Sequence, residues 1–271
     1  MDPKGIRLSC ALAVGGLDPG GGAGLAADLR AFAFAGVFGC AAAAVITIQS
    51  TAGLKSAKAV SPRDLEAQVA EVLRHQRVGA VKVGALGNEA NVRAVVRSLA
   101  RHPRVPVIVD TPMLPTRGRA RLLSPRAVAV LKAELLARAT LLTVNLAEAE
   151  VLVGERVRSV SEAHDAAAAL VDLGARAVLV KGGHLGGPVA TDVLALGGKF
   201  FELRARRLAL PPVHGTGCAL ASLVAGRVAR RTGADLDDRA LVAAVRWAKR
   251  VHHAALANAV DVGRGMRVLV F

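Results

Sequence analysis

Five consecutive residues, His214-Gly215-Thr216-Gly217-Cys218, have the types and spacing of an anion-binding turn. An apolar run over 219–225 follows them and predicts a helix. Two glycines around a threonine let neighbouring backbone N–H groups point the same way at a helix start, where the helix dipole also favours negative charge. Fixed donors of this kind stabilise the charge that develops on a transferred phosphoryl group. The alternative is an ordinary glycine-containing helix start with a buried cysteine.

Cys218 adds a second chemical possibility, because it falls on the first turn of that predicted helix. Amide donors at a helix start favour the thiolate over the thiol. We therefore expect the pKa of Cys218 to fall from its usual ~8.5 towards neutrality, which would let the sulfur accept a proton.

Other polar residues each follow a different short apolar run. These runs predict buried strands over 8–14, 37–48, 80–84, 105–109, 141–144 and 177–180. Helices are predicted between them over 25–34, 61–75, 89–101, 124–137 and 162–173, and later over 217–231 and 238–257. A hairpin is predicted over 191–208, around Gly197-Gly198. Such alternation is typical of an α/β fold with a mostly parallel sheet, in which ligands bind beyond the carboxyl ends of the strands.

The residues just past those strand ends are Gly16, Gln49, Asp110, Asn145 and Lys181. One such residue would mean little, but five at equivalent ends predict a site. A glycine-rich loop, 18–24, follows the first strand and permits close approach to a small ligand. It lacks the Gly-Lys-Ser/Thr ending of a P-loop, and Leu25 stands where a dinucleotide-binding motif needs glycine.

The composition narrows the class of protein. The 271 residues carry a net charge of +15, which alone would suggest a polyanionic partner. The arginines are scattered, however, and aromatic residues make up only 3%, so the pattern favours a solvated basic surface over a nucleic-acid interface. The three cysteines lie far apart, which suits a reducing compartment. The uncharged stretch 31–54 is long enough for a membrane span, but glycines and Gln49 interrupt it. We expect a cytoplasmic protein without a membrane contact, built as one domain over residues 1–271.

The order of these motifs is similar to that of the hydroxymethylpyrimidine kinase/phosphomethylpyrimidine kinase family, which are ribokinase-like enzymes of thiamine biosynthesis. The resemblance runs from about residue 8 to about residue 258. The matching segments are Asp18-Pro19 with its glycines, Ala27-Asp28-Leu29, Gln49-x-Thr51, Lys82-Val83-Gly84, Asn145-x-x-Glu148, Lys181-Gly182-Gly183-His184 and 214–218. The resemblance implies a three-layer α/β/α sandwich. It also implies ATP-dependent phosphorylation of 4-amino-5-hydroxymethyl-2-methylpyrimidine, a second phosphorylation of the product, a requirement for Mg²⁺, and a homo-oligomer, expected to be a dimer.

The resemblance also implies roles for single residues. The Gln49 amide would face the aminopyrimidine edge, and Asp28 with the Gly16 backbone would complete the pocket, although Asp28 could simply favour a helix N-terminus. Lys181 would reach the nucleotide phosphates, and Asn145 with Glu148 would serve magnesium and phosphate. Asp110, an oxygen ligand at a strand end, would face the same metal or the transferred phosphate. Gly215, Thr216 and Gly217 would form the anion hole, and Cys218 would be the catalytic base. The pair Asn145 and Glu148 equally matches an ordinary capping box.

The chain departs from the family pattern in several places. They are Gly20 for the usual Ser, Ser50 for Asn, Arg117-Gly118-Arg119, Pro212-Val213, and the tail Gly263-Arg264-Gly265-Met266. Two alternatives remain beside the pyrimidine kinase. One is a pyridoxal/pyridoxine kinase with the same fold and reaction. The other is a catalytically weak relative that binds the pyrimidine as a regulator.

Overall fold

The computed structural model describes residues 8–110, 112–113, 122–231 and 236–271. Its centre is a nine-stranded sheet in the order β3-β2-β1-β4-β5-β6-β7-β8-β9. The six parallel strands are β1 (Cys10–Leu17), β2 (Phe38–Ser50), β4 (Val78–Val83), β5 (Val107–Asp110), β6 (Leu141–Asn145) and β7 (Ala177–Lys181). The antiparallel strands are β3 (Gly53–Ala59), β8 (Val189–Leu196) and β9 (Lys199–Arg206). A separate parallel pair joins β10 (Val213–His214) to β11 (Arg267–Val268).

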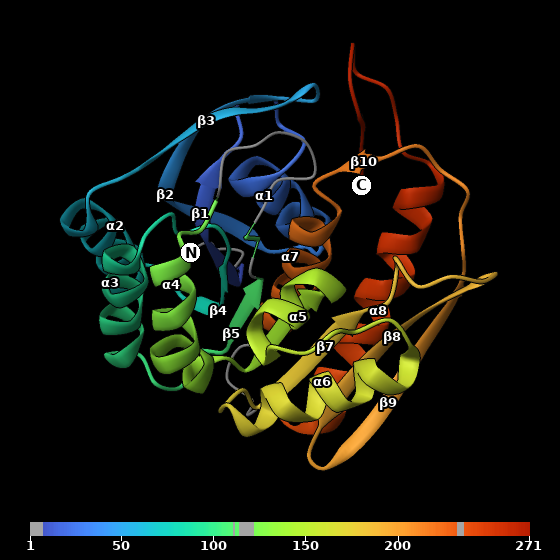
Figure 1. The fold of residues 1–271 in the computed structure, drawn as a ribbon. Helices are drawn as coiled ribbons and strands as arrows, with labels where there is room; N and C mark the ends of the chain where they lie inside the picture. The colour runs from blue at the N-terminus through green and yellow to red at the C-terminus, as the bar shows by residue number, and fades with distance from the viewer. Residues whose placement is uncertain (1–7, 111, 114–121, 232–235) are drawn as a thin grey trace, which may run out of the picture.

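Helices cover both faces of this sheet, which gives three layers (Figure 1). One face packs against α2 (Pro62–His75), α3 (Glu89–Ala100), α4 (Pro125–Val130), α5 (Leu146–Val153) and α6 (Val160–Asp172). The other packs against α1 (Gly24–Phe34), α7 (Thr216–Ala229) and α8 (Asp238–Ala257). Alternate residues of the central strands belong to the two cores: Leu12 and Val14 face one, Ala11 and Ala13 the other. The predicted α/β class with a mostly parallel sheet is therefore confirmed.

Helix starts follow the capping residues of the sequence. Ser61 caps α2, and the Asn145 and Ser159 capping boxes begin α5 and α6. In contrast, α7 begins at Gly215 without a side-chain cap. The first N–H groups of α7 thus have no side-chain acceptor of this kind, which leaves them available to a ligand.

Two parts of the chain differ from the sequence-based expectation. The helix predicted over 124–137 is α4 followed by a π-helical turn, Leu131–Leu135, and a 3₁₀ turn, Leu136–Arg138. The strand β3 was not predicted; it pairs antiparallel with β2 and makes a hairpin at the sheet edge. The uncharged stretch 31–54 forms the end of α1, β2 and the start of β3, and no helix in the described part of the chain is long and apolar enough to cross a membrane.

Candidate active site

The carboxyl ends of β5, β6 and β7 bring together Asp110, Asn145 and Lys181. The Nζ atom of Lys181 lies 3.1 Å from Oδ1 of Asp110. A Cβ atom at Gly217 would lie 3.3 Å from that Nζ atom and 3.7 Å from each Asp110 carboxylate oxygen. The first turn of α7 therefore sits directly on the Lys181–Asp110 pair. Glycine at position 217 keeps space between the backbone and these charges.

Lys181 and Asp110 are poised as an ion pair. Burial by itself raises the pKa of Asp110, but the positive charges of Lys181 and Lys82 outweigh it and hold that pKa below its usual value. Burial lowers the pKa of Lys181, and the negative charges of Asp110 and Glu148 more than compensate and raise it. The site thus holds a fixed ammonium beside the start of α7, where an anion would lie.

Asn145 and Glu148 form the capping box that the sequence allowed as an alternative. The backbone N–H of Asn145 donates to Glu148 at 2.8 Å, and the N–H of Glu148 donates to the Asn145 side chain at 2.9 Å. Burial, aided by the charge of Asp110 and opposed by Lys181, raises the pKa of Glu148 to about 7. The carboxylate also accepts a backbone hydrogen bond from Met113. Because each carboxylate oxygen has two acceptor sites, these bonds do not exclude a role towards a metal.

The donor set at these strand ends suits a weakly held hard cation. Asp110 and Glu148 supply carboxylate oxygens. The positive charge of Lys181 lowers the pKa of both groups, and the negative charge of Asp110 raises that of Glu148. Within the described ranges no group of three or more His, Cys, Asp or Glu residues could hold a metal ion. Two carboxylates match Mg²⁺, which keeps several waters and is usually completed by substrate phosphates.

The anion turn 215–217 is fixed by contacts from two directions. Gly215 has φ 76°, and a Cβ atom there would lie 2.0 Å from the carbonyl oxygen of Gly22 in the glycine-rich loop. On the other side, Nε2 of His252 in α8 lies 2.9 Å from the carbonyl oxygen of Thr216. Burial, together with the charge of Lys249, lowers the pKa of His252 to about 3, so the neutral ring donates this bond. The turn is therefore preorganised, as an oxyanion site requires.

Cys218 lines the cavity below this turn, and one expectation about it is wrong. Burial raises the pKa of its thiol to about 11, and the carboxylates of Asp110 and Asp28 add to that effect. The charge of Lys82 and a backbone N–H bond lower this pKa, but their combined effect is smaller than that of burial and the two carboxylates. The expected thiolate is therefore a thiol in the free protein. Removal from water destabilises the thiolate more than the amide donors at the helix start stabilise it.

The cavity at the strand ends has a volume of about 50 Å³. It is lined by Gly16, Asp18, Ala23, Gly24, Thr47, Gln49, Lys82, Ala85, Pro112, Leu122 and Cys218. The predicted residues Gly16, Gln49 and Cys218 thus meet in one space. Since one water needs ~10–15 Å³ of such volume, the cavity has room for only a few waters, and a substituted six-membered ring has to widen it in order to bind.

Asp28 lies beneath the cavity and is not among its lining residues. Its carboxylate is fully buried, 3.0 and 3.1 Å from Nζ of Lys82, and accepts a 2.7 Å bond from Ser222. Although burial opposes it, the charge of Asp28 raises the pKa of Lys82. Lys82 rather than Asp28 therefore presents the charge to the cavity.

Sequence reasoning gave no role to Asp18 and His214, which form a buried pair. Nε2 of His214 lies 2.9 Å from Asp18 Oδ2 and 3.0 Å from the side-chain amide of Gln49. Asp18 also accepts the N–H groups of Gly20 and Ala23, each at 2.8 Å. The pair thus joins the glycine-rich loop, the anion turn and Gln49. Both residues belonged to the recognised motifs, and that was the only signal for them.

Two of the departures from the family pattern touch each other. A Cβ atom at Gly20 would lie 2.8 Å from the Cα atom of Ser50, so a larger residue at position 20 needs a shift of the hairpin turn. In the tail, the N–H of Met266 donates to the Thr51 carbonyl at 2.8 Å, and Gly265 packs on the same turn. The segment 117–119 lies outside the described residues.

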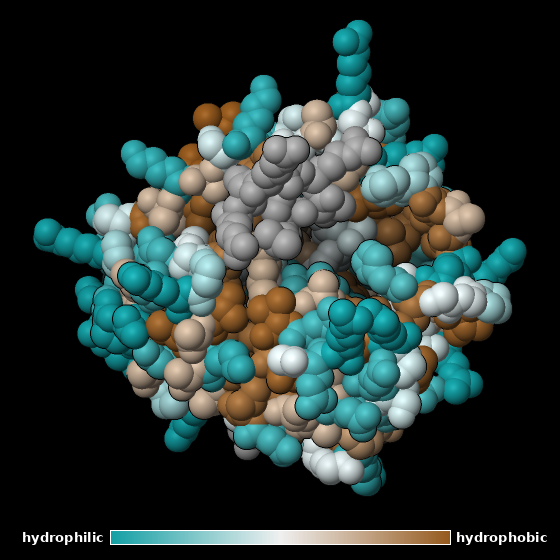
Figure 2. All heavy atoms as spheres, in the orientation of Figure 1, coloured by the Kyte–Doolittle hydropathy of each residue, from teal (hydrophilic) through white to brown (hydrophobic). Residues whose placement is uncertain are grey.

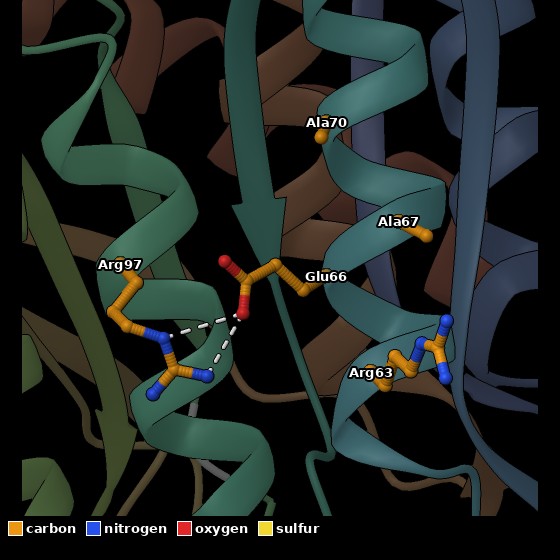
Figure 3. A pocket seen from close by; sticks show the side chains of 5 residues that line it. All are labelled: Arg63, Glu66, Ala67, Ala70 and Arg97. Atoms are coloured by element: carbon orange, nitrogen blue, oxygen red, sulfur yellow. Dashed lines mark hydrogen bonds and ion pairs between the residues drawn. The ribbon is translucent and has the colours of Figure 1, made fainter.

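A larger hollow, about 420 Å³, lies between α2 and α3, away from the strand ends. Its lining residues are Arg63, Glu66, Ala67, Ala70 and Arg97. Figure 3 shows Glu66 and Arg97 reaching towards one another across it, where they pair at 2.8 Å. The groove is open, and its one carboxylate, Glu66, is already paired with Arg97. The smaller cavity is the candidate active site because it gathers the groups that can do chemistry.

The chain is similar in sequence to known kinases. The family model described as phosphomethylpyrimidine kinase matches residues 18–269. A hydroxymethylpyrimidine/phosphomethylpyrimidine kinase of Rhizobium meliloti is 39% identical, with 94% of each chain covered. One of Escherichia coli with the same description is 36% identical, again with 94% of each chain covered.

Solved structures give the same fold. A pyridoxal kinase of Bacillus subtilis, solved as an ADP complex, superposes with a TM-score of 0.86 at 26% identity, with 97% of each chain covered. A phosphomethylpyrimidine kinase of Clostridium difficile superposes with a TM-score of 0.76 at 27% identity, over 91% of this chain and 99% of that one. The chain thus has a ribokinase-like architecture. On the extent of the family match and the identity to these relatives, the chain belongs to the phosphomethylpyrimidine kinase family.

Proposed function

We propose that this protein transfers the γ-phosphoryl group of ATP to the hydroxymethyl group of 4-amino-5-hydroxymethyl-2-methylpyrimidine, and then phosphorylates the monophosphate to the diphosphate. These are steps of thiamine biosynthesis. Relatives at 36–39% identity carry both activities in their names. The observation that carries the proposal is the placement of the cavity with Gln49 and Cys218 next to the Lys181–Asp110 pair under the start of α7.

The residues divide into a pyrimidine side and a phosphate side. Gln49 and the Gly16 backbone bind the ring in the cavity, and Lys82 supplies positive charge at its floor. On the phosphate side, Lys181 and the N–H groups of 215–217 hold the transferred group. Because phosphoryl transfer needs little covalent help, positioning and charge stabilisation supply most of the rate.

Cys218 accepts the proton of the attacking hydroxyl at Sγ. With a pKa of about 11 in the free protein, Sγ already carries a proton at neutral pH and cannot accept another until that proton has left. In a loose transition state the proton leaves late, so only a modest base is needed. Binding must therefore lower this pKa before the thiol can act, and a cation beside the site would do so.

Mg²⁺ is the metal we propose, held by Asp110 and Glu148 through water and completed by the nucleotide phosphates. When bound, it would neutralise the charge that develops on the transferred phosphate. Asn145 keeps Glu148 in place through the capping box. Lys181 accompanies the phosphate and reduces the repulsion between it and Asp110.

A coupled assay that follows ADP release tests the function, with the pyrimidine, its monophosphate and pyridoxal compared side by side. We expect turnover with the first two and a much lower kcat/KM with pyridoxal. In the same assay Cys218→Ala should lose about 10²-fold in kcat, Cys218→Asp should keep part of it, and Cys218→Ser should resemble the alanine variant. Turnover of pyridoxal alone would overturn the pyrimidine assignment.

Pyridoxal kinase is the second candidate because pyridoxal kinases superpose with the higher TM-scores. Their identity to this chain is 24–26%, whereas the named pyrimidine kinases reach 39%. A regulatory relative without activity is disfavoured by the intact Lys181–Asp110 pair and anion turn. Any phosphorylation of the pyrimidine at normal rates removes that alternative.

We also propose a cytoplasmic homodimer. Leu17 and Ile46 are paired across β1 and β2, are 39% and 45% exposed, and lie next to Ile48 at 64%. Contiguous exposed apolar side chains of this kind mark protein interfaces. Figure 2 shows hydrophilic and hydrophobic residues interspersed on the face it presents. Light scattering of the wild type and Ile48→Glu tests the dimer, and a wild-type monomer would overturn it.

A further inference from the structure

Arg207 stands immediately after β9, and its guanidinium lies among the backbone carbonyls of one loop. We call residues 182–188, which directly follow Lys181, the post-lysine loop. The Arg207 side chain donates to the carbonyl oxygen of Gly187 at 2.7 Å and to that of Gly183. It also donates to Gly186 at 3.4 Å, and to Val189, just beyond the loop, at 3.3 Å. One side chain thus satisfies four carbonyls of this segment.

The first residue of the post-lysine loop is fixed separately. The N–H of Gly182 donates to Oδ1 of Asp192 at 3.0 Å, and the other Asp192 oxygen pairs with Lys249 of α8. A Cβ atom at Gly182 would lie 1.8 Å from the carbonyl oxygen of Thr191, so only glycine fits there. The loop is therefore held at its start by β8 and α8 and over its length by Arg207.

The direction of the carbonyls determines the direction of the N–H groups. The described peptides contain no cis bond, and in a trans peptide the C=O and N–H point opposite ways. With the carbonyls of Gly183 and Gly186 turned to the guanidinium, the N–H groups of His184 and Gly187 point away from it. Neither N–H donates to an acceptor among the residues that the structure describes.

The space beside the loop is open. A Cβ atom at Gly183, Gly186 or Gly187 would meet no atom within 4 Å. The two free N–H groups, those of His184 and Gly187, are backed by a permanent positive charge, and together they form a surface that suits oxygen acceptors of an anionic ligand. Lys181, the proposed phosphate ligand, is the residue directly before this surface. The chemistry therefore matches a nucleoside triphosphate that extends from Lys181 over the loop.

We propose that Arg207 is a positioning residue for the nucleotide, acting through the post-lysine loop and not by contact with ATP. The inference deepens the proposed function, because it rests on Lys181 serving the phosphates. Arginine is required for its shape. Its planar group carries five donors in a fixed fork, whereas lysine carries three on one atom and cannot reach carbonyls along the whole loop.

The test compares Arg207→Gln and Arg207→Lys with Arg204→Gln. Arg204 is a matched control because it lies three residues earlier, in β9, and its guanidinium pairs with Glu202 at 2.6 Å. ATP affinity is measured by calorimetry without the pyrimidine, and KM is measured for both substrates. We expect both Arg207 variants to weaken ATP binding about tenfold, the worth of one or two hydrogen bonds. KM for the pyrimidine should change less than twofold, and Arg204→Gln should match the wild type.

Unchanged ATP affinity in Arg207→Gln would overturn the inference. So would an equal rise of both KM values with a lower melting temperature, since that pattern indicates general damage. Faster hydrogen exchange confined to the amides of 183–189 would support it further. A wild type that binds ATP but does not phosphorylate the pyrimidine would refute the proposed function, while the comparison of ATP affinities would still decide the role of Arg207.

Discussion

The pKa of Cys218 makes a quantitative prediction about its reaction with iodoacetamide. At pH 8 a thiol of pKa about 11 is ionised to about one part in a thousand, whereas an ordinary thiol of pKa ~8.5 is about one quarter thiolate. The thiolate fraction is thus about 200-fold lower. A more basic thiolate is also more nucleophilic, and a Brønsted slope of ~0.4–0.5 over about 2.5 pKa units returns about tenfold. Alkylation of Cys218 should therefore be about 20-fold slower than that of glutathione.

The assay is mass spectrometry of the Cys218 peptide, with glutathione in the same tube as the internal reference and Cys218→Ser to identify the peptide. Restricted access slows the reaction equally at every pH, so the pH profile separates access from ionisation. We expect the logarithm of the rate to rise with unit slope from pH 7 to pH 10 without a plateau. A plateau between pH 7 and pH 8 would show a thiolate near neutrality and refute the argument from burial.

Three further changes test other parts of the site. Gln49→Ala should raise KM for the pyrimidine about tenfold or more and leave KM for ATP unchanged in initial-rate measurements; equal rises would remove Gln49 from the pyrimidine pocket. Glu148→Gln should be more stable than the wild type at pH 8, because a carboxyl whose pKa rises from about 4.5 unfolded to about 7 folded loses stability as pH increases through that window. The difference should approach 3 kcal/mol in urea unfolding at pH 8 and nearly vanish at pH 4, whereas loss of stability at both values would contradict it. Lys82→Met should lose about 3–5 kcal/mol of folding free energy, since it leaves Asp28 buried without its partner; Lys55→Met on exposed β3 is the control, and similar melting of both variants would refute the buried charge.

Local sequence signals predicted most of the architecture. The segments Ser61-Pro62 and Asn145-x-x-Glu148 contain capping residues that predict a helix start, and both caps occur as expected. The strand β3 was not predicted because Gly53–Ala59 has lysine, serine and alanine but no β-branched residue, and β-branched residues are the usual local signal of a strand. Its partner β2 imposes the extended conformation, and pairing between strands is not visible in a single local segment.

The ion pairs and protonation states of the site were harder to predict from the sequence than the identity of its residues. Lys82 and Asp28 are far apart in sequence and meet only because α1 packs over the sheet. The pKa of Cys218 depends on how completely the folded chain excludes water, and the residue type with its helix start gave the wrong direction. Asp18 and His214 likewise acquire a role only when the glycine-rich loop and the anion turn are brought together.

The contact of Gly22 with both His214 and Val268 has a consequence for synthesis of the chain. A Cβ atom at Gly22 would lie 2.4 Å from the His214 ring and 2.9 Å from Val268, so three widely separated segments share one small volume. A ribosome adding ~5–20 residues per second needs roughly 10–50 s to pass from the first segment to the last. During that interval β1, β2 and β4 can already pair. The ligand site cannot close before the segment with Val268 has left the ribosome, so the substrate can stabilise only polypeptides that already include this segment.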